Sequence, residues 1–150
     1  MRALITGGAG FVGHHLTRAL VGHGFEATVF DIVSRPHMLP AGVEYCRGSV
    51  LDDTLVKRLV PKADVVVHLA GIAEPMRYGT DPLATMDVNL TGSINVVRQS
   101  ADCGVPVVFS STSEVYGINS SLPWSEDANR VLGPVANVRW CYSTAKVQTS

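Results

Sequence analysis

Long apolar stretches, blocks of like charge and paired cysteines are all missing from this chain. Its longest apolar runs, such as residues 65–67 and 105–109, are far shorter than the ~20 residues that a membrane helix needs. The 12 basic and 13 acidic residues are scattered, so no basic surface is expected for nucleic acid or for an anionic membrane. Nucleic acid and membranes are therefore excluded as expected partners.

Metal-binding and disulfide patterns are missing too. The three cysteines, Cys46, Cys103 and Cys141, form no C-x-x-C pair and no metal-ligand spacing with the five histidines. An odd number of dispersed cysteines is typical of reduced intracellular proteins. The first residues lead straight into a glycine-rich turn, without the apolar stretch of a signal peptide. We therefore expect a cytoplasmic protein without a bound metal.

What the chain does have is an alternation of short β-branched runs with longer segments of helical period. Its 150 residues and 46% hydrophobic content fit one globular domain. Strands are expected at residues 3–5, 27–30, 43–46, 64–69 and 106–109. Helices are expected at about 12–22, 52–60, 81–103 and from 139 onward, with a surface loop at 117–138. This order predicts an α/β fold over residues 1–150, a doubly wound parallel sheet of the Rossmann type.

A glycine-rich turn follows the first expected strand. It contains Gly7, Gly10 and Gly13, and a helix begins within it at Phe11 and Val12. Glycine lets such a turn bend sharply and approach a pyrophosphate, which the free N–H groups of the helix N-terminus attract. The same spacing also occurs in loops without a ligand. Because a strand, a helix and a downstream acid accompany it here, we expect this turn to hold the pyrophosphate of NAD.

The downstream acid is Asp31, at the end of the second expected strand. A carboxylate at this place hydrogen-bonds the ribose diol of the cofactor and repels a 2′-phosphate, which favours NAD over NADP. An aspartate that merely begins a loop is the alternative. The nearby Arg35 also weakens the preference for NAD.

A tyrosine and a lysine, Tyr142 and Lys146, are four residues apart in the last expected helix. Residues at this spacing lie on one face of a helix, so the ammonium group is expected near the phenol, whose pKa it would lower. A phenol stabilised in this way can act as a base at neutral pH. The pair also occurs by chance in many helices, and its place after the fifth strand gives it weight.

Polar residues follow the fifth expected strand as Ser110-Ser-Thr-Ser-Glu-Val-Tyr-Gly117. Ligands of open α/β sheets bind at the carboxyl ends of the strands, where a hydroxyl can hold a substrate alcohol and a carboxylate can move a proton. A polar strand exit, with Tyr116 packed into the core, is the alternative.

Together these motifs resemble the extended short-chain dehydrogenases/reductases that modify nucleotide sugars. The resemblance runs from residue 3 onward through T-G-G-A-G-F-V-G, H-L-A-G, D-V-N-L-T-G, S-S-T-S-E-V-Y-G and Y-S-T-A-K. It implies that Tyr142 is the catalytic base and that Lys146 is its pKa partner and a ribose ligand. It also implies that the hydroxyl of Thr112 helps to hold the C4 oxygen of the sugar. Tyr116 would not be the catalytic tyrosine, and Asn89 would be mainly structural.

The resemblance also implies a set of residues that line the cofactor. Three of them follow the fourth strand, namely Leu69, Ala70 and Gly71. Beside the adenine, where the family usually has an aspartate, this chain has Ser49 and Val50. Ser49 is therefore expected to make a weaker contact than an aspartate would.

A narrower resemblance is to the UDP-glucuronate decarboxylases, carried by residues 112–117, Gly133-Pro-Val and Arg139-Trp-Cys-Tyr-Ser. In that group the acid that matches Glu114 assists decarboxylation and proton transfer together with the neighbouring Ser113. Related dehydratases have Asp-Glu at this pair, and epimerases usually have no acid there. Decarboxylation of UDP-glucuronate is therefore the expected reaction. An NDP-sugar 4-epimerase or 4,6-dehydratase and a non-catalytic NAD-binding module are the alternatives.

The family continues beyond the helix in which this chain ends, with a region that binds the nucleotide sugar. We therefore expect the sugar-nucleotide domain to be absent from this chain, which would be a fragment truncated within the Tyr-x-x-x-Lys helix or a domain that binds NAD without turnover. For the full-length protein the resemblance implies a UDP-sugar substrate and a homodimer.

Overall fold

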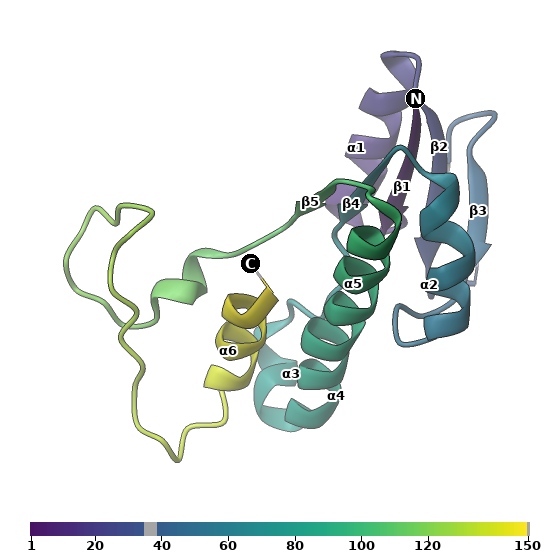
Figure 1. Cartoon of the computed structure of the whole chain (residues 1–150). Coiled ribbons are helices and arrows are strands. Elements are labelled where there is room, and N and C mark those ends of the chain that lie inside the picture. The colour runs from purple at the N-terminus through teal and green to yellow at the C-terminus, as the bar shows by residue number, and fades with distance from the viewer. Residues whose placement is uncertain (35–38, 150) are drawn as a thin grey trace.

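The computed structural model describes residues 1–34 and 39–149, and within them the strands form a five-stranded parallel sheet (Figure 1). The order across the sheet is β3-β2-β1-β4-β5. The order therefore reverses at β1, the switch point at which open α/β sheets bind their ligands. The predicted doubly wound parallel sheet is confirmed. The strands span β1 (Arg2–Thr6), β2 (Glu26–Asp31), β3 (Glu44–Arg47), β4 (Val65–His68) and β5 (Val107–Phe109).

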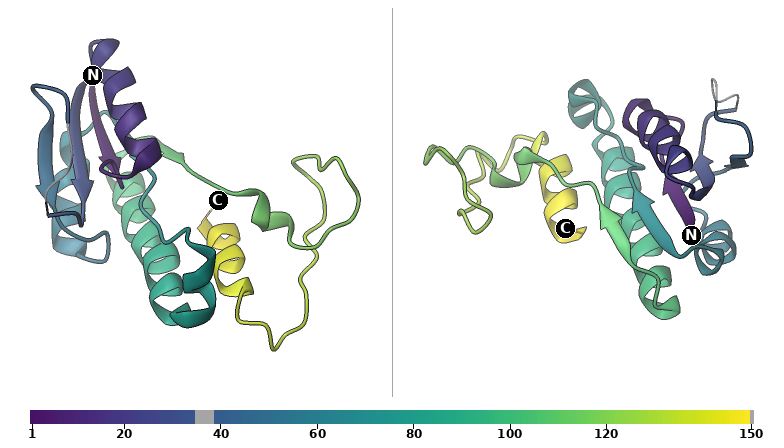
Figure 2. Two further views of the ribbon diagram at one scale, coloured as in Figure 1. Left: turned by 180° about the vertical axis from the view of Figure 1, so that it is seen from behind. Right: turned by 90° about the horizontal axis from the view of Figure 1, so that it is seen from above.

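Helices cover both faces of the sheet, with α1 (Phe11–Gly22) on one face and α2 (Asp53–Leu59) and α5 (Ser93–Cys103) on the other (Figure 2). Alternate residues of β1 show the division, because Ile5 packs in the cluster on the α1 side and Leu4 in the cluster on the α2 and α5 side. Strands buried on both faces need continuous apolar sequence, which is why β1 and β4 are nearly all apolar.

The long helix expected at 81–103 is present, but it is not a uniform α-helix. It consists of α4 (Pro82–Met86), a π-helical segment η2 (Asp87–Gly92) and α5. Asp81 caps the first turn through its Oδ1, which accepts a hydrogen bond from Ala84 N at 3.2 Å. Gly104 ends the helix with φ 66°, a left-handed conformation that glycine adopts without strain. Segments of π-helix are frequent at functional sites.

Two short helices were not expected from the sequence. One is α3 (Pro75–Thr80), whose proline at the first helical position was an available signal. The other is the 3₁₀ turn η3 (Ser113–Tyr116) after β5. A further 3₁₀ turn, η1 (Val60–Lys62), extends α2. Among the described residues, no helix combines the length and the apolar character needed to cross a membrane.

The expected surface loop reaches away from the sheet before the chain returns in α6 (Trp140–Thr149) (Figure 1). Near its two ends the loop is joined to itself by backbone hydrogen bonds. Ile118 N donates to Val131 O at 2.7 Å, and Val131 N donates to Tyr116 O at 3.2 Å. The loop therefore has a fixed base.

A buried histidine, His68, connects the sheet with the long helix. Its Nδ1 lies 2.6 Å from Thr6 Oγ1, and its Nε2 lies 2.9 Å from Ser93 Oγ. Ser93 Oγ donates to Asn89 O, so it must accept from Nε2–H. Nδ1 of this neutral tautomer carries no proton, so Thr6 Oγ1 donates to it while accepting from Ala70 N. Every partner fits a neutral histidine with its proton on Nε2, and its hydrogen bonds join β1, β4 and the start of α5.

We predict that this histidine makes the fold sensitive to acid. Burial lowers the pKa of His68 to about 4, and the positive charge of Lys146 adds to the effect. Above pH 6.5 the histidine is neutral in both states, and as the pH falls toward 4 only the unfolded chain takes up a proton. The free energy of unfolding should therefore fall by about 3 kcal/mol over this interval.

Urea unfolding at a series of pH values measures this loss. His68→Asn should be less stable at neutral pH and should lack the His68 part of the slope, whereas the exposed His23→Gln should keep it. A slope that is the same in wild type and His68→Asn would show that the histidine does not carry the effect.

Candidate active site

The glycine-rich turn brings the backbone of β1 close to that of β4. Gly7 has φ +69°, and a Cβ built there would lie 2.7 Å from Ala70 N. A Cβ at Gly13 would lie 2.5 Å from Gly7 O, so the first turn of α1 passes directly over the loop. Real side chains do not fit at these distances. The turn is therefore a backbone cradle, of the shape that a pyrophosphate requires.

The N-terminus of α1 is open above this cradle. No side chain caps the helix at Gly10, and its first turn contains no acid. Phe11 and Val12 are 82% and 61% exposed, so the first turn of α1 lies at the surface next to the glycines. Free amides and the helix dipole attract an anion. These features fit the pyrophosphate of NAD.

The carboxylate of Asp31 is held beside the same turn. Its Oδ2 accepts from Ala9 N at 2.9 Å, and its Oδ1 accepts from Val33 N at 3.3 Å. The acid expected to bind the ribose is therefore fixed at the carboxyl end of β2, next to the glycines. Arg35, which weakened the preference for NAD in the sequence, lies outside the described residues.

The remaining expected cofactor residues lie along the carboxyl edge of the sheet. Leu69 N donates to Thr6 O, and Ala70 N donates to Thr6 Oγ1. A Cβ on Gly71 would lie 2.5 Å from Asn89 Oδ1. Their contacts with NAD stay predictions.

Beyond β3, Ser49 and Val50 behave differently from each other. Ser49 Oγ accepts from Leu51 N at 3.2 Å and so closes a local turn. Val50 is buried, and its carbonyl oxygen accepts from Asn95 Nδ2 at 3.1 Å. Val50 is thus a packing residue whose backbone is fixed against α5, and adenine binding by either residue stays a prediction.

The expected catalytic residues converge from α6 and from the end of β5. Tyr142 is 5% exposed and Lys146 is 4% exposed. Thr112 and Tyr142 are joined by a side-chain hydrogen bond. Lys146 Nζ donates to Ser110 O at 3.0 Å and lies 4.8 Å from the centre of the Phe109 ring. The structure therefore brings Thr112, Tyr142 and Lys146 to one edge of the sheet.

Burial controls the ionisation of this pair. It raises the pKa of Tyr142, and the negative charge of Glu114 raises it further, whereas hydrogen bonds with Thr112 and Tyr78 lower it. Burial also lowers the pKa of Lys146. The hydrogen bonds with Thr112 and Tyr78 are thus the contributions that favour the phenolate form of Tyr142. That Lys146 lowers the pKa of Tyr142 stays a prediction.

Glu114 lies next to this pair, in η3. Thr112 caps η3 by accepting from Glu114 N at 3.3 Å, and Ser143 Oγ donates to Glu114 O at 2.8 Å. Arg139 Nη2 lies 3.3 Å from Glu114 Oε1. Within the described part of the chain, Glu114 Oε2 is buried and has no hydrogen-bond partner. One carboxylate oxygen is therefore anchored by Arg139, while the other is buried and lacks a hydrogen-bond partner. Ser113 begins η3, and its role stays a prediction.

Two residues of this region were missed by the sequence analysis. Tyr78 of α3 packs against Tyr142, and no sequence pattern pointed to it. Arg130 of the loop donates from Nη2 to Ser143 Oγ at 3.2 Å and to Thr144 Oγ1 at 2.8 Å. Arg130 thus ties the loop to α6 directly beside Tyr142.

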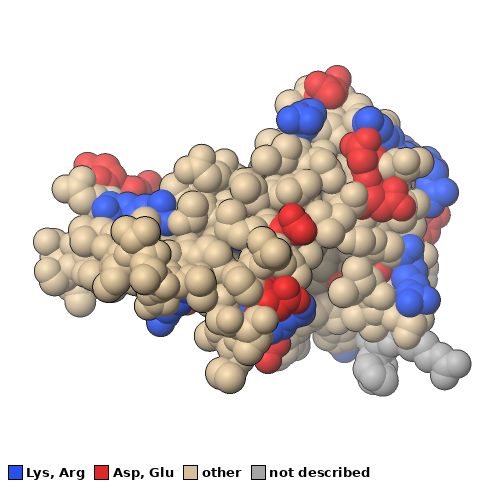
Figure 3. All heavy atoms as spheres, turned by 90° about the horizontal axis from the view of Figure 1, so that it is seen from below, with Lys and Arg blue, Asp and Glu red and all other residues tan. Residues whose placement is uncertain are grey.

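A metal cluster or a basic patch would mark a different kind of site. Over residues 1–34 and 39–149, no group of three or more His, Cys, Asp or Glu side chains is arranged to hold a metal. On the face shown in Figure 3, basic and acidic residues are interspersed rather than gathered in one basic patch.

We predict that Gly13→Ala weakens cofactor binding. The added methyl group would meet Gly7 O and Gly8 Cα at 2.5 Å and push α1 off the loop, at a cost of about 1–3 kcal/mol. Titration calorimetry with NAD should show affinity at least about tenfold weaker, as that cost implies. Gly22→Ala is the matched control, since nothing lies within 4 Å of a Cβ there. Unchanged affinity in Gly13→Ala would contradict the assignment of the cradle.

The chain has relatives of known activity. It is 36% identical over 150 residues to a UDP-N-acetyl-alpha-D-glucosaminuronate decarboxylase from Bacillus cytotoxicus, covering 97% of this chain and 46% of that protein. It is 35% identical over 147 residues to UDP-glucuronic acid decarboxylase 1 from Danio rerio, covering 97% of this chain and 35% of that protein. The chain thus spans less than half the length of these relatives.

Solved structures and a family model agree with this likeness. The structure of a UDP-glucose 4-epimerase from Brucella ovis in complex with NAD matches with a TM-score of 0.85 and 26% identity, over 99% of this chain and 45% of that one. Residues 3–150 match the model of the NAD dependent epimerase/dehydratase family, in agreement with the expected cofactor and with the cradle described above. The chain belongs to the NAD-dependent epimerase/dehydratase family of nucleotide-sugar enzymes.

Proposed function

We propose that this chain supplies the NAD site and the proton-transfer residues for decarboxylation of UDP-glucuronate through a transient 4-keto sugar. The observation that carries the proposal is the placement of Glu114, whose Oε2 is buried without a partner beside Tyr142. The decarboxylases among the relatives support the same reaction.

The first step removes two hydrogens from C4 of the sugar. Tyr142, as the phenolate, takes the proton of the C4 hydroxyl, and Thr112, hydrogen-bonded to Tyr142, holds the C4 oxygen. NAD⁺, when bound, accepts the hydride from C4 and later returns it. The cradle of the glycine-rich turn and Asp31 would hold it by its pyrophosphate and ribose.

The second step breaks the bond between C5 and its carboxylate. The C4 ketone makes the sugar a β-keto acid, so the electrons of this bond move onto O4 as CO₂ leaves. Hydrogen bonds from Thr112 and from the now protonated Tyr142 stabilise the enolate. Glu114, which takes up one proton from solvent in each turnover, then delivers it from Oε2 to C5, while Arg139 holds Oε1 and fixes the direction of the carboxyl group. Tyr142 gives its proton back to O4 as the hydride returns to C4, and is again a phenolate.

The chain covers 46% and 35% of the two decarboxylases. A binding site for the nucleotide sugar is therefore proposed and not observed. A UDP-sugar substrate, a homodimer and a cytoplasmic location belong to the proposal in the same way, and so does NAD binding without turnover by these 150 residues alone.

A 4-epimerase is the second candidate, favoured by the match with the Brucella ovis enzyme. Thr112, Tyr142 and Lys146 would serve such a reaction equally well, because the oxidation at C4 is the same. The difference lies in Glu114, which an epimerase does not need for returning hydride to the other face of C4.

We predict that the full-length gene product converts UDP-glucuronate to a UDP-pentose and CO₂ in the presence of NAD. Because the hydride returns in each turnover, no NADH should accumulate. Trapped CO₂ and chromatography of the nucleotide sugars measure the reaction. Absence of both products would eliminate decarboxylation of this substrate, and a 4-epimer in their place would establish the second candidate.

We further predict that Glu114→Gln lowers the rate of decarboxylation about a hundredfold or more, the range typical of a lost general acid. The amide keeps the shape of the side chain but has no acidic proton to give. Glu126→Gln, an exposed acid of the loop, is the matched control and should keep the wild-type rate. An enzyme whose Glu114→Gln variant stays fully active would be acting without this carboxylate, as an epimerase does.

A further inference from the structure

A second tyrosine lies flat against Tyr142. The rings of Tyr78 and Tyr142 are stacked, with their centres 4.5 Å apart and their planes at 8°. Tyr78 is 2% exposed and belongs to α3, far from α6 in the sequence. Cys141 Sγ lies 3.7 Å from Tyr78 O and joins the same two helices. The ring of Tyr142 is therefore held by a neighbour on a separate element.

A hydrogen bond between the two side chains raises the pKa of Tyr78 and lowers that of Tyr142. The direction of this bond follows from their ionisation. Burial raises the pKa of Tyr78, and negative charge on Tyr142 or Glu114 raises it further. Tyr78 therefore keeps its proton when Tyr142 loses its own. The O–H of Tyr78 is then the donor and the oxygen of Tyr142 is the acceptor.

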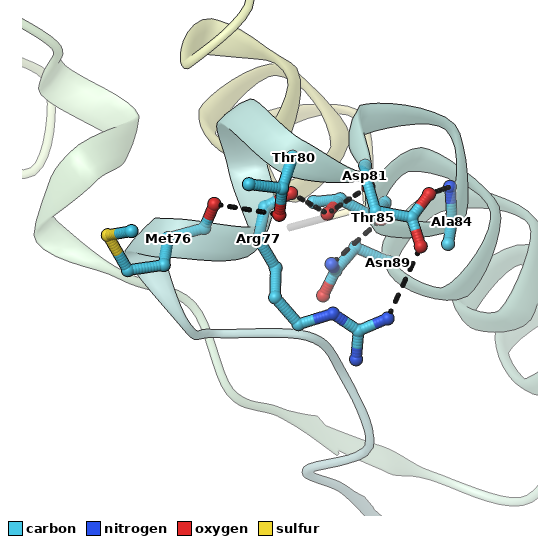
Figure 4. Close-up of polar contacts among 7 residues, drawn as sticks. All are labelled: Met76, Arg77, Thr80, Asp81, Ala84, Thr85 and Asn89. Atoms are coloured by element: carbon cyan, nitrogen blue, oxygen red, sulfur yellow. Dashed lines mark hydrogen bonds and ion pairs between the residues drawn. The ribbon is translucent and has the colours of Figure 1, made fainter.

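The position of α3 is fixed by a polar cluster beneath it (Figure 4). Thr85, which is fully buried, donates from Oγ1 to Asp81 O at 2.9 Å, and Arg77 O lies 3.4 Å from the same hydroxyl. Asn89 Nδ2 donates to Thr85 O at 2.8 Å and to Ile72 O at 3.0 Å. These bonds join α3 and its preceding segment to α4 and η2. The helix that carries Tyr78 is thus held in place by several hydrogen bonds.

We infer that Tyr78 is a positioning residue of the active site, which orients the Tyr142 ring by stacking and donates a hydrogen bond to the Tyr142 oxygen. This inference rests on the proposed role of Tyr142 as the base. Thr112 and Tyr78 then supply two donors to one phenolate oxygen. Charge-assisted hydrogen bonds of this kind are stronger than neutral ones. They offset part of the cost of a negative charge in a buried place.

A purely structural role for Tyr78 makes a different prediction. A ring that only fills space is replaced by phenylalanine without effect on the chemistry of its neighbour. A ring that also donates a hydrogen bond leaves Tyr142 with one donor fewer when its hydroxyl is removed. Tyr78→Phe therefore separates the two roles, because it keeps the stack and deletes the donor.

The experiment compares Tyr78→Phe with Tyr116→Phe in the full-length protein with NAD. Tyr116 stacks on Trp124 and is not part of the proposed machinery, so its variant removes the same atom without touching Tyr142. Carbon NMR of ring-labelled tyrosine follows the ionisation of Tyr142, whose signal is identified by its absence in Tyr142→Phe. In parallel, kcat/KM for UDP-glucuronate is measured against pH.

In Tyr78→Phe the Tyr142 midpoint should move up by about one pH unit, the size expected for one hydrogen bond to a charged group. At a fixed pH on the acid side, kcat/KM should fall about tenfold for the same reason and recover as the pH is raised. Tyr116→Phe should superimpose on wild type in both measurements.

The inference is overturned if the Tyr142 midpoint is the same in wild type and Tyr78→Phe, or if kcat/KM falls equally at every pH. The NMR measurement needs no turnover. If the protein leaves UDP-glucuronate unchanged, the proposed function fails while the NMR result still decides the role of Tyr78.

Discussion

Burial of two ionisable side chains on one helix, Tyr142 and Lys146, is the constraint on which the site depends. Neither is more than 5% exposed, and a charge in such a place is costly unless other groups compensate for it. Lys146 has the carbonyl oxygen of Ser110 and the face of the Phe109 ring. Tyr142 has the hydroxyl groups of Thr112 and Tyr78. All four compensating groups come from outside α6. The environment of Tyr142 and Lys146 therefore forms only when α6 packs against α3 and the end of β5.

The same sheet edge also fixes the cofactor side of the site. Thr6, at the end of β1, accepts a hydrogen bond from Ala70 N and donates one to His68. Through Ser93 this network reaches the π-helical segment that carries Asn89. Asn89 in turn supports the segment before α3. These hydrogen bonds connect the strand end beside the nucleotide cradle with the segment before α3, and a neutral histidine lies at their centre.

Local patterns in the sequence predicted much of this arrangement. Gly7, Gly13 and Asp31 were identifiable because a tight turn and a strand end demand particular residue types, and the apolar runs predicted the sheet. Tyr78 was not identifiable, because its role depends on a contact with α6 that no spacing encodes. The π-helical segment and Arg130 were missed for the same reason, since both are defined by tertiary hydrogen bonds. The individual contacts of these residues with NAD and with the sugar cannot be derived from local sequence, because they depend on how the bound molecules lie.

The hydrogen bonds that close the loop at residues 117–138 determine which part of it can change in length. Its ends are held by the hydrogen bond from Ile118 N to Val131 O and by the hydrogen bond from Arg130 to Thr144 of α6. Loop-closure entropy rises only slowly with length, so the tip between these points tolerates insertion and deletion. A change in the length of the tip therefore leaves the surroundings of Glu114 and Tyr142 in place.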